Sequence, residues 1–215
     1  MRIVAVADTH LFHEDLVIPD GDVFVHAGDM CRRGTLAELG VAARWLAEMP
    51  HRHKVIIAGN HDWPFVRTPA EARALFAGMH YLEDDEVTLD GVRFYGSPWQ
   101  PEFLGWAFNL PRGPELVAVW AKIPAGVDVL ITHGPPAGIG DRVGDRLTGC
   151  DDLRRRIEEL APPLHVFGHI HEDGGAWRLG GSTIANVTTW DGDRGASVFD
   201  LDGGVVTPVA IPAKG

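Results

Sequence analysis

The sequence predicts an α/β protein in which a largely parallel β-sheet packs against a second, mixed sheet. Three observations lead to this prediction. Short apolar runs rich in Val and Ile alternate with segments that carry helix-capping signals, other apolar runs follow one another without helices, and the 215 residues are 45% hydrophobic and 23% charged. Such a composition is typical of a globular chain with one large core. We therefore predict a single domain over residues 1–215.

Five apolar runs have the length and composition of buried strands. They cover residues 2–7, 22–27, 54–58, 127–132 and 164–167. Helical signals lie between them. Thr35-Leu-Ala-Glu38 has the pattern of a capping box, and Thr68-Pro-Ala-Glu71 places a proline at the first helical position of a segment that ends at Gly78. Residues 151–160 form a third amphipathic segment, which stops before two prolines. Strands that alternate with helices predict βαβ units and a parallel sheet.

Three further segments, 86–97, 182–189 and 196–201, have the composition of strands but no helix between them. Asp90-Gly91 stands between two apolar runs of the first segment, which is a hairpin signal. These segments therefore predict the second, mixed sheet.

Polar side chains capable of binding metal follow each of the five predicted strands. In α/β proteins ligands bind beyond the carboxyl ends of the strands. Side chains at positions i and i+2 of a strand face the same side. Asp8 and His10 can therefore bind one ion together, and His169 and His171 can share a site in the same way. The candidates are Asp8, His10, Asp29, Asn60, His133, His169 and His171.

Seven ligands exceed the need of one ion, and two ions with a bridging carboxylate fit better. Nitrogen and oxygen donors without thiolate suit Mn²⁺ best, with Fe or Zn as alternatives. Two divalent ions outweigh the carboxylates of Asp8 and Asp29 and leave the site at about +2. The site would therefore attract a phosphate ester although the chain has a net charge of −11.

The same residues suggest a reaction. Water bridging two ions has its pKa lowered towards about 7 and can attack phosphorus directly. His61 follows Asn60 but is not needed as a ligand, so we assign it as general acid or transition-state stabiliser. Asp62 is expected to orient the ligands rather than bind an ion.

Five short blocks, "DTH", "HAGD", "AGNHD", "THGPP" and "GHIH", stand in an order that resembles the calcineurin-like metallophosphoesterase superfamily. The longer stretches "PDGDVFVHAGDMCRRG", "YGSPWQPEFLGWAFNLPRG" and "LHVFGHIHEDGG" resemble the small MPPED-type (class III cyclic-nucleotide-like) phosphodiesterases. The resemblance extends from Arg2 to Asp200. It implies a four-layer αββα sandwich, two mixed sheets flanked by helices, with a dinuclear metal centre.

The family pattern also implies how the ligands are divided. One ion would be held by Asp8, His10, Asp29 and His171. The other would be held by Asp29, Asn60, His133 and His169, and His61 matches the catalytic histidine of the family. Animal MPPED-type members carry glycine at the position of His169 and are expected to hold their second ion poorly. The histidine in this chain predicts full dinuclear activity.

We therefore predict a dinuclear phosphoesterase that hydrolyses phosphodiesters, with cyclic nucleotides as candidates, by direct attack of metal-bound hydroxide. A phosphomonoesterase acting on nucleotides or phosphoproteins is one alternative, and a non-catalytic scaffold of the same fold is another. Arg33 is a candidate phosphate contact. Trp99 and Asn109, in the aromatic segment 94–113, are candidate contacts for a nucleotide base.

Composition limits the classes of binding partner and the cellular location that can be expected. The acidic charge argues against a nucleic-acid polymer, and no apolar run approaches the ~18 residues that a membrane span requires. No signal peptide is visible, and Cys31 and Cys150 form no motif, so a reducing cytoplasm is expected. The expected partner is a small phosphate ester, with a nucleotide as one candidate. The oligomeric state is left open, with a homodimer as one option.

Overall fold

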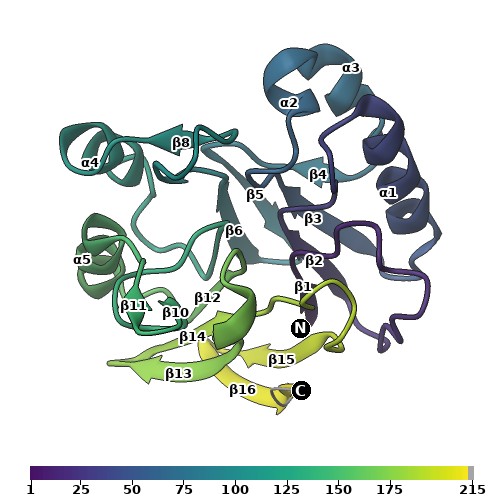
Figure 1. Ribbon diagram of the computed structural model, residues 1–215. Helices are drawn as coiled ribbons and strands as arrows, with labels where there is room; N and C mark the ends of the chain where they lie inside the picture. Colours follow the sequence, from purple (N-terminus) through teal and green to yellow (C-terminus); the bar gives the residue numbers. More distant parts are fainter. Residues whose placement is uncertain (213–215) are drawn as a thin grey trace.

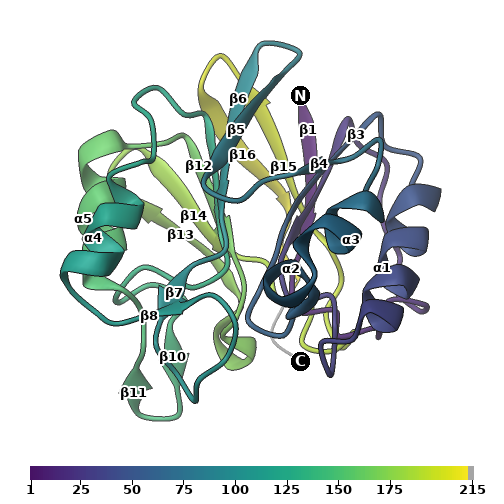
Figure 2. The same ribbon diagram turned by 90° about the horizontal axis from the view of Figure 1, so that it is seen from above.

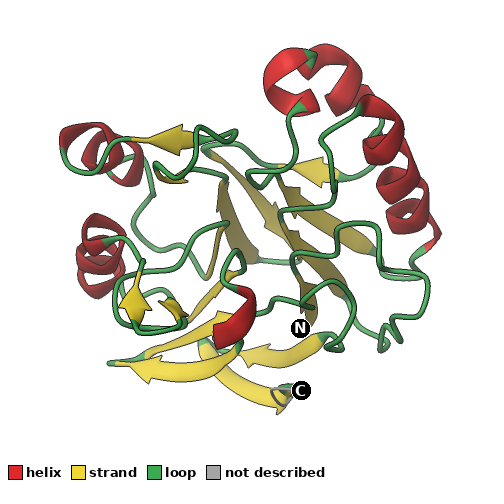
Figure 3. Ribbon diagram, viewed as in Figure 1, coloured by secondary structure: helices red, strands yellow, loops and turns green. Residues whose placement is uncertain are grey.

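Two six-stranded sheets face each other at the centre of the molecule, and helices cover their outer faces (Figures 1 and 2). Figure 3 shows the same division, with the helices outside and the strands between them. This arrangement, in a computed structural model that describes residues 1–212, confirms the predicted four-layer α/β sandwich. The single domain predicted over 1–215 extends past the described residues and stays a prediction.

The first sheet has the strand order β16-β15-β1-β2-β3-β4. Its parallel part contains β1 (Arg2–Val6), β2 (Val23–Ala27), β3 (His53–Ile57) and β4 (His80–Tyr81). Two antiparallel strands complete its edge, β15 (Ser197–Asp202) and β16 (Val205–Ala210). The helices that follow β2 and β3 in the chain are α1 (Leu36–Glu48), α2 (Pro64–Arg67) and α3 (Pro69–Ala74).

The capping signals are confirmed in part. The Thr35 hydroxyl accepts a hydrogen bond from the Glu38 N–H at 3.2 Å, and the Glu38 carboxylate accepts one from the Thr35 N–H at 3.4 Å. Pro69 begins α3 as predicted, but the helix ends at Ala74, before the predicted exit at Gly78. The last residues of the segment continue as turns.

The second sheet has the strand order β13-β14-β12-β9-β6-β5. Its inner strands are parallel: β6 (Val92–Ser97), β9 (Val129–Thr132), β12 (Leu164–Phe167) and β14 (Ser182–Asn186). Its edges are antiparallel: β5 (Asp85–Leu89) and β13 (Gly175–Leu179). Asp90 and Gly91, both at positive φ, join β5 to β6 and confirm the predicted hairpin. Short elements fill the loops: β7 (Gln100–Pro101), β8 (Asn109–Leu110), β10 (Arg142–Val143), β11 (Arg146–Leu147) and the 3₁₀ helix η1 (His171–Asp173).

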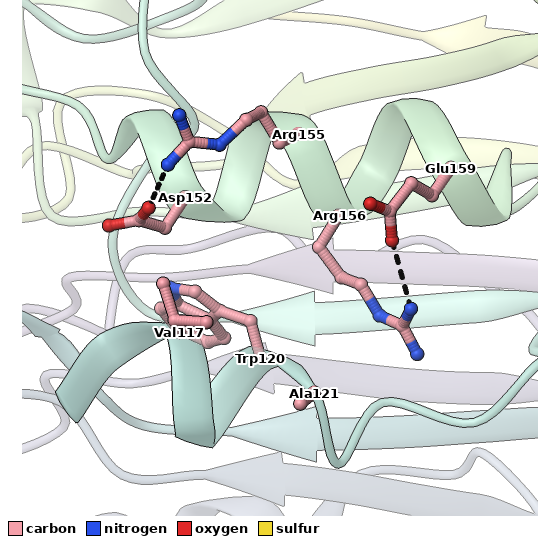
Figure 4. A pocket seen from close by; sticks show the side chains of 7 residues that line it. All are labelled: Val117, Trp120, Ala121, Asp152, Arg155, Arg156 and Glu159. Carbon is pink, nitrogen blue, oxygen red and sulfur yellow. Dashed lines mark hydrogen bonds and ion pairs between the residues drawn. The ribbon is translucent and has the colours of Figure 1, made fainter. Parts of the chain in front are cut away.

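Helices α4 (Pro114–Trp120) and α5 (Asp151–Leu160) form the outer layer on the second sheet. The Trp120 ring is buried beneath α5, whose surface carries the ion pairs Arg155–Asp152 and, at 3.0 Å, Arg156–Glu159 (Figure 4). A hollow of about 160 Å³ lies between these residues. None of the predicted site residues lines it. Among residues 1–212 no helix is long and apolar enough to cross a membrane.

The core between the two sheets is apolar. Each sheet also has one buried histidine on its opposite face, which packs against the helices. His26 on β2 hydrogen-bonds Thr9 at 3.0 Å, and His165 on β12 hydrogen-bonds Thr132 at 2.8 Å. Burial lowers the pKa of each of these two imidazoles to about 3. Both rings are therefore neutral structural groups.

Candidate metal centre

Residues that follow β1, β2, β3, β9 and β12 meet at the carboxyl edges of the two sheets. Three sets of side chains each bring their ligand atoms within 4.8 Å of one another. These sets are Asp8–His10–His171, His10–Asp29–His61 and Asp29–His133–His169. Asn60 joins the third set, because its Oδ1 lies 2.9 Å from Nε2 of His133. The structure thus brings all seven predicted ligands and His61 into one cluster.

The backbone that presents these ligands is not the pleated strand assumed from the sequence. Strand β1 ends at Val6, before Asp8 and His10, and β12 ends at Phe167, before His169. Asp8, His10, Asp29 and His169 have φ values of 53°, 42°, 59° and 69°, in the left-handed region that L-residues rarely adopt. The reasoning from the i, i+2 pleat is therefore wrong, although the residues do converge. Such backbone strain concentrates at functional sites.

Glycines in the motifs make this convergence possible. A side chain at Gly168 would overlap Ala7 and the Asp8 carboxylate. Without it, the N–H of His169 reaches both carboxylate oxygens of Asp8 at 3.0 Å. A side chain at Gly59 would likewise overlap Asp29 and the ring of His133. These two glycines let the loops of the two sheets approach each other closely.

Two imidazoles are fixed by backbone carbonyls. Nδ1 of His10 lies 2.8 Å from the carbonyl oxygen of Cys31, and Nδ1 of His133 lies 2.9 Å from that of Ala27. A carbonyl only accepts, so each Nδ1 carries the proton. The Nε2 atoms then face the Asp29 Oδ2, at 3.7 Å from His10 and 3.4 Å from His133. Ligand histidines in metalloproteins are oriented in this way.

The surroundings of His133 show that the cluster fits a cation. Its Nε2 is close to two oxygen acceptors, Oδ1 of Asn60 and Oδ2 of Asp29. Burial alone would lower the pKa of His133, but the carboxylate of Asp29 more than offsets this and raises it to about 9. Burial also works against the charge of Asp29, yet His133 and His10 hold its pKa well below the usual range. These acceptors require a positive charge among them, supplied by a proton or by a metal ion. The mixed nitrogen and oxygen donors suit a divalent transition metal.

His169 and His171 are different, because within residues 1–212 no hydrogen bond holds either ring. Burial and the neighbouring His133 lower the pKa of His169 to about 4. Its imidazole is therefore neutral at pH 7 and can donate a lone pair to an ion. The ring of His171 lies 5.4 Å from that of His10.

Asp62 holds the loops of the first sheet together, as the sequence suggested. Its carboxylate accepts hydrogen bonds from four backbone N–H groups at 2.8–3.3 Å. They belong to Asp29, Met30, Cys31 and Gly59. Asp62 thereby fixes both Asp29 and the carbonyl that orients His10.

His61 lies at the rim of the cluster. Its backbone N–H donates to Oδ1 of Asp29 at 2.7 Å, and Nδ1 hydrogen-bonds the carbonyl of Arg32 at 2.9 Å. The ring stands between those of His10 and Trp106, with centroid distances of 4.6 and 4.2 Å. Geometry alone therefore permits His61 to act on a substrate or to bind an ion beside His10 and Asp29.

The structure does not bring the three predicted substrate contacts to the cluster. Trp99 donates its indole N–H to Asp84 at 3.2 Å, Asn109 is hydrogen-bonded to Gln100 and to the Phe103 carbonyl, and Arg33 is exposed. None of the three lines a hollow beside the cluster.

Other residues of the aromatic segment lie there instead. A hollow of about 220 Å³ over the ligands is walled by Phe103, Leu104 and Trp106. The aromatic composition of residues 94–113 indicated that rings would lie near the site, but composition does not show which ring faces it. Asp191 was missed altogether. Its Oδ1 lies 3.8 Å from Nε2 of His10, and no motif marks this position.

The comparisons with known proteins agree with this geometry. Residues 1–173 match the family described as "Calcineurin-like phosphoesterase". The human "Metallophosphoesterase domain-containing protein 1" is 40% identical over 213 residues, which cover 87% of this chain and 65% of that protein. The chain thus spans about two thirds of that relative. The solved structure of the Thermus thermophilus protein TT1561 is similar in fold, with a TM-score of 0.64, 16% identity, and 96% and 97% of the two chains covered. The chain belongs to the calcineurin-like phosphoesterase family.

Proposed function

We propose that the protein is a metal-dependent phosphoesterase that hydrolyses phosphodiesters, with cyclic nucleotides among the candidate substrates. The observation that carries the proposal is the convergence of lone-pair donors from both sheets around Oδ2 of Asp29, with His61 at the rim. A buried cluster of this kind has little structural value on its own, because unpaired acceptors cost stability. The substrate proposed is a small ester rather than a nucleic-acid polymer, in a cytoplasmic setting.

The side chains would divide the work between two sites. Asp8, His10 and His171 would hold one ion, Asn60, His133 and His169 the other, and Asp29 would bridge them. When bound, divalent ions, most suitably Mn²⁺, would supply a water of lowered pKa and would offset the negative charge of the phosphate. Asp62 keeps Asp29 and the His10 carbonyl partner in place, so that the ligands need not reorganise on binding.

His61 would assist the leaving group. Its Nδ1 is committed to the Arg32 carbonyl, which leaves Nε2 available to the substrate. In the cationic ring Nε2 carries a proton, which it would donate to the departing alkoxide. In the neutral ring no proton remains there, so protonated His61 is the competent form. No Ser or Cys lies among the cluster residues, so water would attack phosphorus without a phosphoenzyme.

The test is hydrolysis by purified protein that has been stripped with a chelator and reloaded with Mn²⁺. A panel of mono- and diesters should show turnover only after reloading, with diesters preferred. Inversion at a chiral phosphorothioate is expected for direct attack by water. Net retention would contradict direct attack, preference for monoesters would favour the phosphomonoesterase, and absence of turnover with two ions bound would favour the scaffold.

A further inference from the structure

A second cavity adjoins the metal cluster and has no role in the chemistry described above. It has a volume of about 420 Å³. We call it the side cavity, and its apolar lining consists of Pro101, Phe103, Pro135, Val143, Leu147 and Ile170. Cavities of a few hundred Å³ with mostly apolar walls are typical sites for small organic groups.

The side cavity lies next to the hollow over the cluster. Phe103 and His169 line both spaces, and His169 is a candidate ligand of the second ion. A phosphate held at the cluster would therefore place an attached organic group at the entrance of the side cavity.

Hydrogen bonds hold the backbone of the cavity walls in place, although several of their apolar side chains are exposed. One wall is the β10–β11 hairpin, which projects from the body of the molecule (Figure 2). The Asp141 carboxylate ties its base by accepting the N–H groups of Gly138 and Gly149, at 2.8 and 3.0 Å. Arg112 on the other side donates to the Thr148 and Gly149 carbonyls, both at 2.7 Å. The cavity is thus preformed, which lowers the entropic cost of binding.

Three exposed apolar side chains face one another across the side cavity. Phe103 on one wall is 57% exposed, and Leu147 and Val143 on the hairpin are 60% and 36% exposed. An isolated exposed apolar residue needs no explanation, but facing sets beside a polar site mark binding surfaces. The lining also contains Arg112 and Arg146 against one carboxylate, Glu102, so its charge favours an anionic ester in an otherwise acidic protein.

We propose that the side cavity binds the organic group of the phosphate ester and selects a flat apolar group, such as an aromatic or heterocyclic ring, over a short aliphatic one. This inference rests on the proposed function, since it places the phosphate at the cluster. Small esters with a ring are then the substrate class, in preference to esters of short aliphatic groups such as phosphorylated serine side chains.

Two phosphonates that differ only in the organic group test the proposal. Phenylphosphonate and methylphosphonate, which are not hydrolysed, are titrated into Mn²⁺-loaded protein by calorimetry. Phenylphosphonate should bind about tenfold more tightly, as expected for burial of a ring. The variant Val143→Ser/Leu147→Ser should lose most of this preference while its affinity for methylphosphonate stays unchanged. Because both side chains are exposed, the variant should fold normally.

The matched control is Val66→Ser/Leu75→Ser, which removes exposed apolar side chains from α2 and the end of α3. It should keep the full preference for phenylphosphonate. Equal affinities in the unmodified protein, an unchanged preference in the hairpin variant, or equal weakening of both ligands would each overturn the proposal. Absence of turnover on every ester would refute the proposed function separately, because the phosphonate titrations do not depend on hydrolysis.

Discussion

Two kinds of imidazole meet in the candidate metal centre, and each of the two proposed ligand sets contains one of each kind. His10 and His133 are anchored, because the carbonyls of Cys31 and Ala27 fix their Nδ1 atoms. His169 and His171 come from the loop after β12, and no hydrogen bond holds their rings within the described chain. The anchored rings belong to the protein's packed interior, whereas we propose that the loop rings serve ion binding alone. Loss of the two kinds should therefore have different consequences.

The largest effect is expected for an anchored ring. His133→Ala removes a ligand, leaves the Ala27 carbonyl without its partner and leaves the charge of Asp29 buried beside one fewer partner. Turnover should fall by more than roughly 10⁴-fold, beyond the cost of losing one acid–base group. The metal-free protein should also lose about 1–3 kcal/mol of unfolding free energy. Urea unfolding of the metal-free variant measures this, and unchanged stability would remove the distinction between the two kinds of ring.

His61→Ala should have the next largest effect, with a different signature. Metal content should stay at two ions, while kcat falls by about 10²–10⁴-fold for an ester with a poor leaving group. The fall should be smaller for p-nitrophenyl esters, whose leaving group needs no proton. Loss of an ion would make His61 a ligand, as its position beside His10 and Asp29 permits. Equal losses on both substrates would instead make it a phosphate-positioning group.

A loop ring should be the mildest to lose. His169 has φ of 69°, a conformation that glycine adopts without strain, so His169→Gly removes the imidazole and little else. The second ion should bind at least about 10–100-fold more weakly, and excess Mn²⁺ should partly restore turnover by mass action. The unfolding free energy of the metal-free protein should change by less than about 1 kcal/mol. Two tightly bound ions with normal turnover would show that His169 is not a ligand.

The contrast also explains what the sequence could reveal. The convergence of the candidate ligands was predictable, because each follows a short apolar run with the composition of a strand. Their presentation was not, because the close approach of Asp8 to the loop after β12 depends on space provided by Gly168, far away in the sequence. The anchoring carbonyls were also hidden, since every residue carries one.

The surroundings of the cluster were harder to predict than the ligands. Trp99 and Trp106 lie in the same aromatic segment. Composition does not predict that Trp99 donates a hydrogen bond to Asp84, whereas the Trp106 ring packs beside His61. The β10–β11 hairpin has strands of two residues each, too short for any alternation of apolar and polar residues to appear. The hairpin wall of the side cavity therefore could not be predicted from the sequence.

The most direct test of the account is the anomalous scattering of a crystal of the protein soaked in Mn²⁺. The account predicts two peaks ~3.5–4 Å apart, with the Asp29 carboxylate in contact with both. One ion should be bound by His10 and His171, and the other by His133 and His169. A single peak, or two peaks of which only one touches Asp29, would contradict a dinuclear centre bridged between the two sheets.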